Sequence, residues 1–171
     1  MKFLLPWLLI SYTVQDTSIV FGDPVQTAAW DVIPDIIICD GAPVSLQRVE
    51  NAAEYWRHLG HNIGEVTVAS HNNYGCINQI ALVGTIQINL ASQSFDMARQ
   101  IGLTKTWSIK DTKEIFKSRI EVMSGWGDTE RIMEHELGHA LGFRDYNQTG
   151  HIMHSDWSRG GLNAKGLKNN R

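Results

Sequence analysis

The arrangement of this chain is decided by residues 134–145, which read EHELGHALGFRD. His135 and His139 are four residues apart, so on a helix both imidazoles lie on one face, one turn apart. That spacing can hold a single zinc ion, and Glu136 beside it can act as a general base. A glycine then predicts the end of the helix, and the aspartate that closes the stretch offers a further oxygen. The rest of the chain is therefore expected to support this helix and the metal site on it.

The composition is typical of a folded globular protein. Of the 171 residues, 43% are hydrophobic and 19% are charged, which suits a single domain with a buried core rather than a disordered chain. The formal net charge is -3, and no basic run is long enough to predict a nucleic-acid partner. We expect one domain over residues 30–171 that acts as a monomer.

Residues 1–22 are set apart from this domain. Lys2 precedes an apolar run of about eight residues, a length typical of a secretory signal peptide and too short for a stable membrane span. No A-x-A cleavage site follows, so an N-terminal arm that stays attached is the alternative. The signal-peptide interpretation predicts a secreted or extracellular protein.

The two cysteines, Cys39 and Cys76, leave two possibilities open. They are compatible with one disulfide in an oxidising compartment, or with two buried thiols. Neither belongs to a C-x-x-C pair, so a zinc site built from cysteines is not expected.

The spacing of apolar residues predicts a mixed α/β (α+β) fold. Strands are expected near residues 35–40, 65–70, 84–90, 102–109 and 114–123, and helices over 45–59 and 129–141. The β-branched run 35–40 fits a central strand that is buried on both faces. Residues 11–33 are expected to form a linker or a loose N-terminal segment.

The two predicted helices carry recognisable ends. Ser45 is a plausible N-cap of the first, and Asp128 can cap the second. The first helix should bury one apolar stripe. That stripe consists of Leu46, Val49, Ala53 and Trp56.

The zinc motif continues beyond its first five residues. Gly142 and Asp145 complete an H-E-x-x-H-x-x-G-x-x-D pattern, and Met153 follows a short loop downstream in the sequence GHIMH, residues 150–154. This longer pattern resembles the metzincin zinc endopeptidases, and most of all their small matrixin-type catalytic domains. The aspartate at the third position is similar to the snapalysin type of small secreted bacterial protease. The resemblance covers about residues 30–157.

The resemblance implies a zinc-dependent endopeptidase with a metzincin-like fold. Such a fold has a twisted mixed sheet of four to five strands, one packing helix, a zinc-binding active-site helix and a Met-turn. His135, His139 and Asp145 would bind Zn²⁺ and leave the fourth position to water. Glu136 would be the general base. Met153 would form the apolar floor beneath the metal.

The identity of the third ligand stays open, since His151 and then His154 are alternatives to Asp145. The histidines remote from the motif are expected on the surface or in loops. They are His58, His61 and His71.

The resemblance also implies a substrate and where it binds. An extended peptide or protein should add to a sheet edge near Gly102–Trp107, and the segment up to Trp157 should wall a specificity pocket. Two other functions use the same residues: a zinc-binding structural, surface or virion module without turnover, and an amidase of cell-wall peptides. An intact Glu136 argues against a purely structural site.

Overall fold

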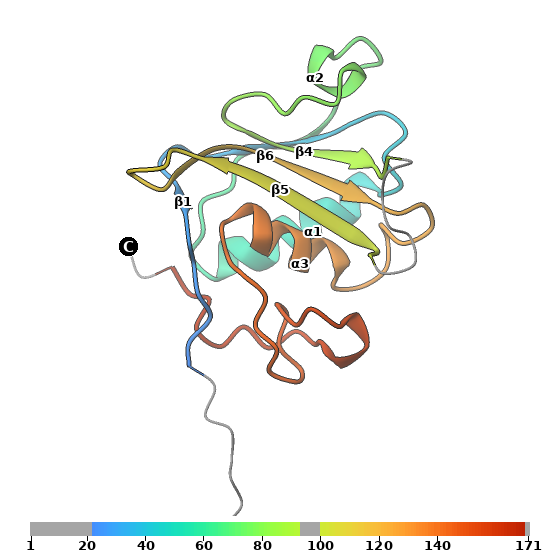
Figure 1. Cartoon of the computed structure of the whole chain (residues 1–171). Coiled ribbons are helices and arrows are strands. Elements are labelled where there is room, and N and C mark those ends of the chain that lie inside the picture. Colours follow the sequence, from blue (N-terminus) through green and yellow to red (C-terminus); the bar gives the residue numbers. More distant parts are fainter. Residues whose placement is uncertain (1–21, 93–99, 170–171) are drawn as a thin grey trace, which may run out of the picture.

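The computed structural model describes residues 22–92 and 100–169, which form a mixed sheet with two helices on one face (Figure 1). The expected signal peptide lies outside the described residues, apart from Gly22. No helix in the described ranges has the length and apolar character needed to cross a membrane.

Six strands make up the sheet. They are β1 (Ala29–Trp30), β2 (Asp35–Ile38), β3 (Val66–Val68), β4 (Thr85–Leu90), β5 (Gly102–Ser108) and β6 (Glu114–Val122). The order is β1-β6-β4-β2-β3, with all of these pairs parallel, and β5 pairs antiparallel with β6. The predicted mixed sheet is confirmed, with one more strand than expected. In the described part of the chain β5 pairs with no other strand, so it is a sheet edge, as its polar, lysine-bearing sequence predicts.

The helices are α1 (Leu46–His58), the short α2 (Tyr74–Ile77), α3 (Ile132–Ala140) and a 3-10 turn at Trp157–Arg159. α1 and α3 lie beneath the sheet in Figure 1, and α2 projects from the opposite side. The core forms where Trp56 of α1 and Leu137 of α3 meet apolar residues of β2, β4 and β6.

The first helix forms largely as predicted. The side chain of Ser45 accepts a hydrogen bond from the backbone N–H of Arg48, which satisfies one of the free donors at the helix start. The buried stripe is Val49, Ala52, Ala53 and Trp56. The inclusion of Leu46 was wrong, because this first helical residue is 44% exposed.

Residues 22–33, the part of the expected linker that the structure describes, pack against the domain instead of forming a loose segment, and residues 11–21 lie outside the described residues. β6 begins at Glu114, four residues before the first residue that pairs with β4. On this unpaired start of β6, Ala29 and Trp30 pair with Glu114 and Ile115. The indole of Trp30 also donates to the carbonyl of Ala140 at the end of α3, at 2.9 Å.

The cysteines resolve in favour of the disulfide. Cys39 follows β2 and is bonded to Cys76 in α2, across 37 residues of sequence. The disulfide joins the segment that contains α2 to the end of strand β2. The expected turn after β3 includes this short helix, because the side chain of Asn73 caps it.

α3 begins later than predicted and without the predicted cap. Its N-cap residue is Arg131, in the left-handed conformation (φ 74°), and no side chain caps the helix. Asp128 instead accepts hydrogen bonds from the backbone N–H and hydroxyl of Ser45, at 2.9 and 2.8 Å. It joins the loop before α3 to the start of α1.

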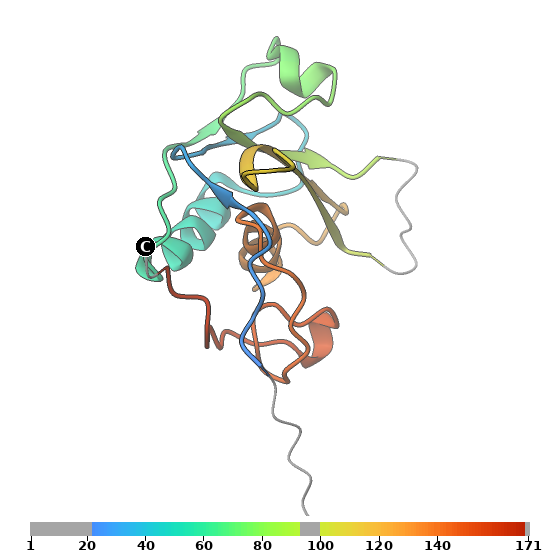
Figure 2. The same cartoon turned by 60° about the vertical axis from the view of Figure 1, so that its left-hand side comes forward.

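The C-terminal segment returns to the end of α1 (Figure 2). The backbone N–H of Asn169 donates to the carbonyl of Leu59, and the Nε2 of His61 bonds the carbonyl of Leu167 at 2.7 Å. His61 is a loop residue but not a surface one, since it is 6% exposed and packs edge-on against Trp56 and Phe143. His58 and His71 are exposed, as expected.

Candidate metal centre and cleft

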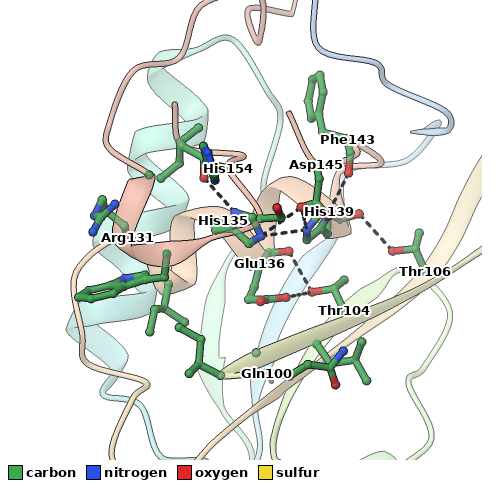
Figure 3. Close-up of a pocket in the computed structure, with 18 of the residues that line it drawn as sticks. Gln100, Thr104, Thr106, Arg131, His135, Glu136, His139, Phe143, Asp145 and His154 are labelled. Carbon is green, nitrogen blue, oxygen red and sulfur yellow. Dashed lines mark hydrogen bonds and ion pairs between the residues drawn. The ribbon is translucent and has the colours of Figure 1, made fainter. Parts of the chain in front are cut away.

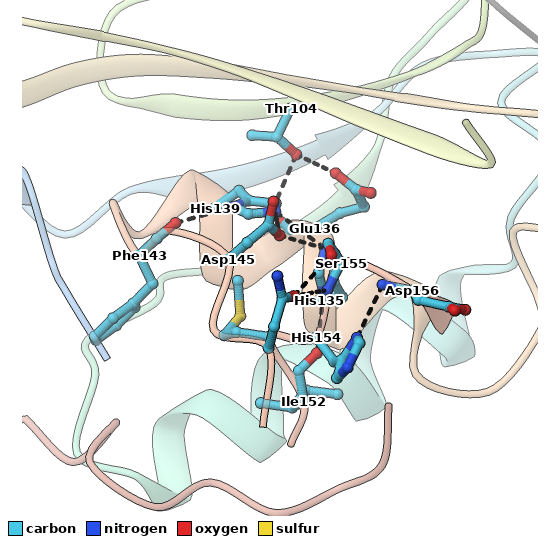
Figure 4. Close-up of polar contacts among 12 residues, drawn as sticks. Thr104, His135, Glu136, His139, Phe143, Asp145, Ile152, His154, Ser155 and Asp156 are labelled. Atoms are coloured by element: carbon cyan, nitrogen blue, oxygen red, sulfur yellow. Dashed lines mark hydrogen bonds and ion pairs between the residues drawn. The ribbon is translucent and has the colours of Figure 1, made fainter. Parts of the chain in front are cut away.

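The two motif histidines face each other on α3 with their Nε2 atoms 3.0 Å apart (Figure 4). The Nδ1 of His135 lies 2.9 Å from the carbonyl of Ile152, and that of His139 lies 2.8 Å from the carbonyl of Phe143. A carbonyl oxygen can only accept, so each Nδ1 carries the proton and each Nε2 presents a lone pair. Both rings are thereby fixed with their acceptor nitrogens directed at one point.

Asp145 is the third member of this group. Its Oδ1 lies 3.3 Å from the Nε2 of His139 and 3.7 Å from the Nε2 of His135. Three ligand atoms, one from each residue, lie within 4.8 Å of one another. The structure therefore brings together the three residues that the motif predicted as ligands.

The turn after α3 explains why Asp145 reaches the histidines. Gly142 has a φ of 94°, and a Cβ there would lie 2.0 Å from the carbonyl oxygen of Ala28. Only glycine meets both requirements. Beyond the turn, the backbone N–H of Arg144 donates to the carbonyl of Val25, at 3.0 Å. The N-terminal segment thus fixes the backbone at Arg144, one residue before Asp145.

The alternative ligands lie outside this group. His151 is fully buried with both ring nitrogens in use: Nδ1 accepts from the backbone N–H of Met153, and Nε2 lies 3.1 Å from the carbonyl of Lys165. His154 lines the cleft, and its Nδ1 accepts from the backbone N–H of Asp156. Geometry therefore favours Asp145 as the third ligand.

Met153 packs against the helix between the two histidines. It is fully buried, and a Cβ on Gly138 would lie 2.3 Å from its sulfur. Gly138 is the residue that allows this approach. Met153 therefore packs against α3, and its role as an apolar floor beneath a metal stays a prediction.

Glu136 is buried under the edge strand. Its carboxylate oxygen Oε2 accepts a hydrogen bond of 2.6 Å from the hydroxyl of Thr104, and its Oε1 would lie 2.2 Å from a Cβ on Gly102. The residue is 5% exposed, and burial raises the pKa of its carboxyl group, an effect that the hydrogen bond from Thr104 opposes. Thr104 and Gly102 together form a cradle for the carboxylate.

The surroundings shift the pKa values of the two histidines in opposite directions. Burial and the neighbouring His139 lower the pKa of His135 to about 4. Burial also acts to lower the pKa of His139, but the hydrogen bond with Asp145 and the charge of Glu136 outweigh it and raise that pKa. The same hydrogen bond lowers the pKa of Asp145. The pair of imidazoles thus accepts one positive charge readily beside an ionised carboxylate.

These residues fit a zinc ion. With zinc–ligand bonds of about 2.0–2.1 Å in a tetrahedral site, ligand atoms lie roughly 3.3–3.4 Å apart. The three separations of 3.0, 3.3 and 3.7 Å bracket that value. Two fixed imidazoles and one carboxylate are also a donor set that zinc prefers, and three protein ligands leave one position open.

A cleft of about 530 Å³ contains this group. At the C-terminal end of α3 its lining includes Ala28 and Thr106, and at the N-terminal end it includes Ile101, Arg131 and Trp157. Figure 3 shows Arg131 and Thr106 on opposite sides of the histidines. Trp157 lines the cleft, and its role in a specificity pocket stays a prediction.

Two residues of the cleft escaped prediction. Thr104 could have been found from the alternation of the predicted edge strand, because Thr104 and Thr106 share one face and both hydroxyls approach α3. Arg131 had no sequence signal, since the left-handed conformation that places it depends on the loop around it.

Comparison with models of protein families, and with the sequences of curated proteins, gives no match to this chain. The interpretation of the site therefore depends on its geometry.

Proposed function

We propose that this protein is a zinc-dependent endopeptidase with a metzincin-like active site. The observation that carries the proposal is the convergence of His135, His139 and Asp145 on one point, with the buried carboxylate of Glu136 in the same cleft. A site that served only to hold the fold together would close all four metal positions with protein ligands. Among the residues that the structure describes, this group offers three possible ligand atoms, and a cleft lies beside them.

His135, His139 and Asp145 would hold the ion. When bound, zinc supplies a Lewis acid that polarises the scissile carbonyl and lowers the pKa of a water molecule toward about 7. The carbonyls of Ile152 and Phe143 hold both imidazoles in place, so the ligands need little rearrangement.

Glu136 moves the proton. Its carboxylate accepts a proton from the attacking water and donates it to the nitrogen of the departing amine. Because burial raises its pKa, the carboxyl group is better matched to this two-way transfer than an exposed glutamate. The hydroxyl of Thr104 holds Oε2 during the transfer.

β5 would hold the substrate. Its edge away from β6 has no strand partner in the described residues, and it runs beside the cleft from Gly102 to Ser108. Main-chain hydrogen bonds to this edge would keep a peptide extended across the metal site. The substrate class that fits is therefore an extended segment of a peptide or protein.

The disulfide supports a location outside the reducing cytosol. Cys39–Cys76 is of the kind that persists in oxidising compartments, and it agrees with the apolar run expected to act as a signal peptide. We include secretion in the proposal for that reason.

The test is the variant Glu136→Gln in the full chain. It should bind zinc in the same stoichiometry as wild type, measured by elemental analysis, and its cleavage of casein should fall by about 10²–10⁴-fold. Glu130→Gln is the matched control, because it removes the same charge from an exposed position just before α3.

Undiminished cleavage by Glu136→Gln would eliminate Glu136 as the base. Wild type that binds zinc but cleaves neither casein nor a random peptide library would instead identify a binding module.

A further inference from the structure

We propose that the end of the cleft at the start of α3 binds a carboxylate of the substrate through Arg131. The inference deepens the proposed function and rests on it, since it names a chemical feature that the peptide must carry.

Arg131 occupies an unusual backbone position. Its φ of 74° lies in the left-handed region, which a residue with a side chain rarely adopts. Asparagine, aspartate and glycine tolerate that region best, and arginine gains nothing from it locally. At this position it also provides no side-chain cap for α3. What the conformation does achieve is to direct a long cationic side chain along the wall of the cleft.

One face of the Arg131 guanidinium stacks on an aromatic ring. It lies over the ring of Trp157, 4.9 Å from the ring centroid, and Trp157 is itself fixed by the edge of Trp126 and by a bond from its Nε1 to the carbonyl of Glu130. Gly160 leaves room beside it, because a Cβ there would approach Nη1 to 3.0 Å. Stacking of this kind orients a guanidinium while leaving the N–H groups at its rim available.

Those N–H groups have no acceptor among the residues that the structure describes. No ion pair or hydrogen bond joins the Arg131 side chain to residues 22–92 or 100–169. Arg48 on α1 differs in this respect, because its guanidinium donates hydrogen bonds to both carboxylate oxygens of Glu134. Arg131 is also the sole lysine or arginine that lines the cleft in the described chain.

A half-buried guanidinium with free N–H groups matches a carboxylate better than any other peptide group. The planar fork can donate two parallel hydrogen bonds to the two oxygens, and partial burial strengthens them. The carboxylate can belong to an aspartate or glutamate side chain, or to the C-terminus of the peptide. Both present the same chemistry at the cleft end near Ile101, Arg131 and Trp157.

The experiment uses the zinc-loaded full chain and quenched fluorescent peptides in matched pairs. One series exchanges glutamate for glutamine at each position around the cleaved bond. The second compares free and amidated C-termini. At one position on one side of the bond, or at the C-terminus, wild type should favour the carboxylate by roughly 10- to 100-fold in kcat/KM. Which series responds identifies the source of the carboxylate.

Arg131→Gln should reduce that ratio to within about twofold of unity, and Arg131→Glu should invert it in favour of lysine at the same position. Arg159→Gln is the matched control, since Arg159 is exposed, lies two residues after Trp157 and does not line the cleft. It should keep the wild-type ratio. Each ratio compares two peptides on the same enzyme, so partial misfolding of a variant cancels.

Binding of the same pairs, measured by fluorescence anisotropy, separates this inference from the proposed function. Carboxylate-dependent binding that Arg131→Gln abolishes would support the carboxylate site even if no peptide is cleaved. A wild type without preference, or a preference that survives in Arg131→Gln, would overturn it.

Discussion

The substitution Thr104→Val removes one hydroxyl from the edge strand and leaves the shape of the side chain almost unchanged. In the structure that hydroxyl donates to Oε2 of the buried Glu136 at 2.6 Å. We expect the variant to fold, to bind zinc as wild type does, and to lose turnover.

The magnitude follows from the bond that is lost. A hydrogen bond to a charged group contributes about 1.5–3 kcal/mol, and each 1.4 kcal/mol corresponds to a factor of ten. If the bond acts fully in holding the carboxylate where the proton is transferred, kcat should fall roughly 10- to 100-fold. A displacement of the base by about 1 Å would have an effect of similar size.

The effect should be on kcat and not on KM. The Thr104 side chain faces α3, where its oxygen also lies 3.1 Å from the backbone carbonyl of Glu136, while the substrate is proposed to pair with the backbone of β5. Steady-state cleavage of one peptide by wild type, Thr104→Val and Thr104→Ser separates these terms. Serine keeps the hydroxyl and should recover most of the rate.

Equal kcat values for wild type and Thr104→Val would refute the reasoning, provided that zinc content is equal. A rise in KM with constant kcat would do so as well, because it would assign Thr104 to substrate binding.

Three further predictions concern the ligand set, the disulfide and pH. Asp145→Ala should weaken zinc binding by more than the roughly 10- to 100-fold that is usual for an outer partner of a ligand, whereas His151→Gln should retain zinc and lower the melting temperature; competition with a chromophoric chelator and thermal unfolding measure the two effects. Reduction of Cys39–Cys76 should lower the free energy of unfolding by about 2–4 kcal/mol, measured in urea with and without a phosphine reductant after saturation with zinc. Burial lowers the pKa of His61 in the folded state. The stability that the neutral imidazole contributes is therefore complete above the unfolded pKa of about 6.5 and is lost as the pH falls below that value. Between about pH 7.5 and pH 5, the free energy of unfolding in urea should therefore fall less for His61→Gln than for wild type.

The parts of the fold that sequence predicted are those with local causes. α1 follows from a serine cap and an apolar stripe of helical period, and β5 with β6 follows from two polar-alternating runs joined by a short turn. β1 could not be predicted in this way. Its two residues are strand only because β6 extends beyond β4 and offers them a free edge.

In the candidate site, too, the features with local causes could be predicted and those that depend on tertiary contacts could not. The i, i+4 spacing of His135 and His139 requires only that the segment is helical. The choice of Asp145 over His151 depends on Gly142, on the N-terminal segment that fixes the chain beyond it, and on the carbonyl of Lys165 that occupies the alternative histidine. Those contacts join residues that are more than ten positions apart in the sequence, so a short sequence motif cannot predict them.

The same dependence on tertiary contacts links the base to the proposed substrate edge. Gly102 and Thr104 belong to β5, and both act on the carboxylate of Glu136: one by providing space, the other by donating a hydrogen bond. A peptide that adds to the free edge of β5, as proposed, would therefore pair with the strand that holds the carboxylate of the proposed base. Glu136 itself belongs to α3, so a shift of β5 relative to α3 would change the distance between the scissile bond and the carboxylate, and the hydrogen bond from Thr104 opposes such a shift. For that reason a side chain at Gly102, which would meet Oε1 at 2.2 Å, should disturb catalysis even though it is no ligand of the metal.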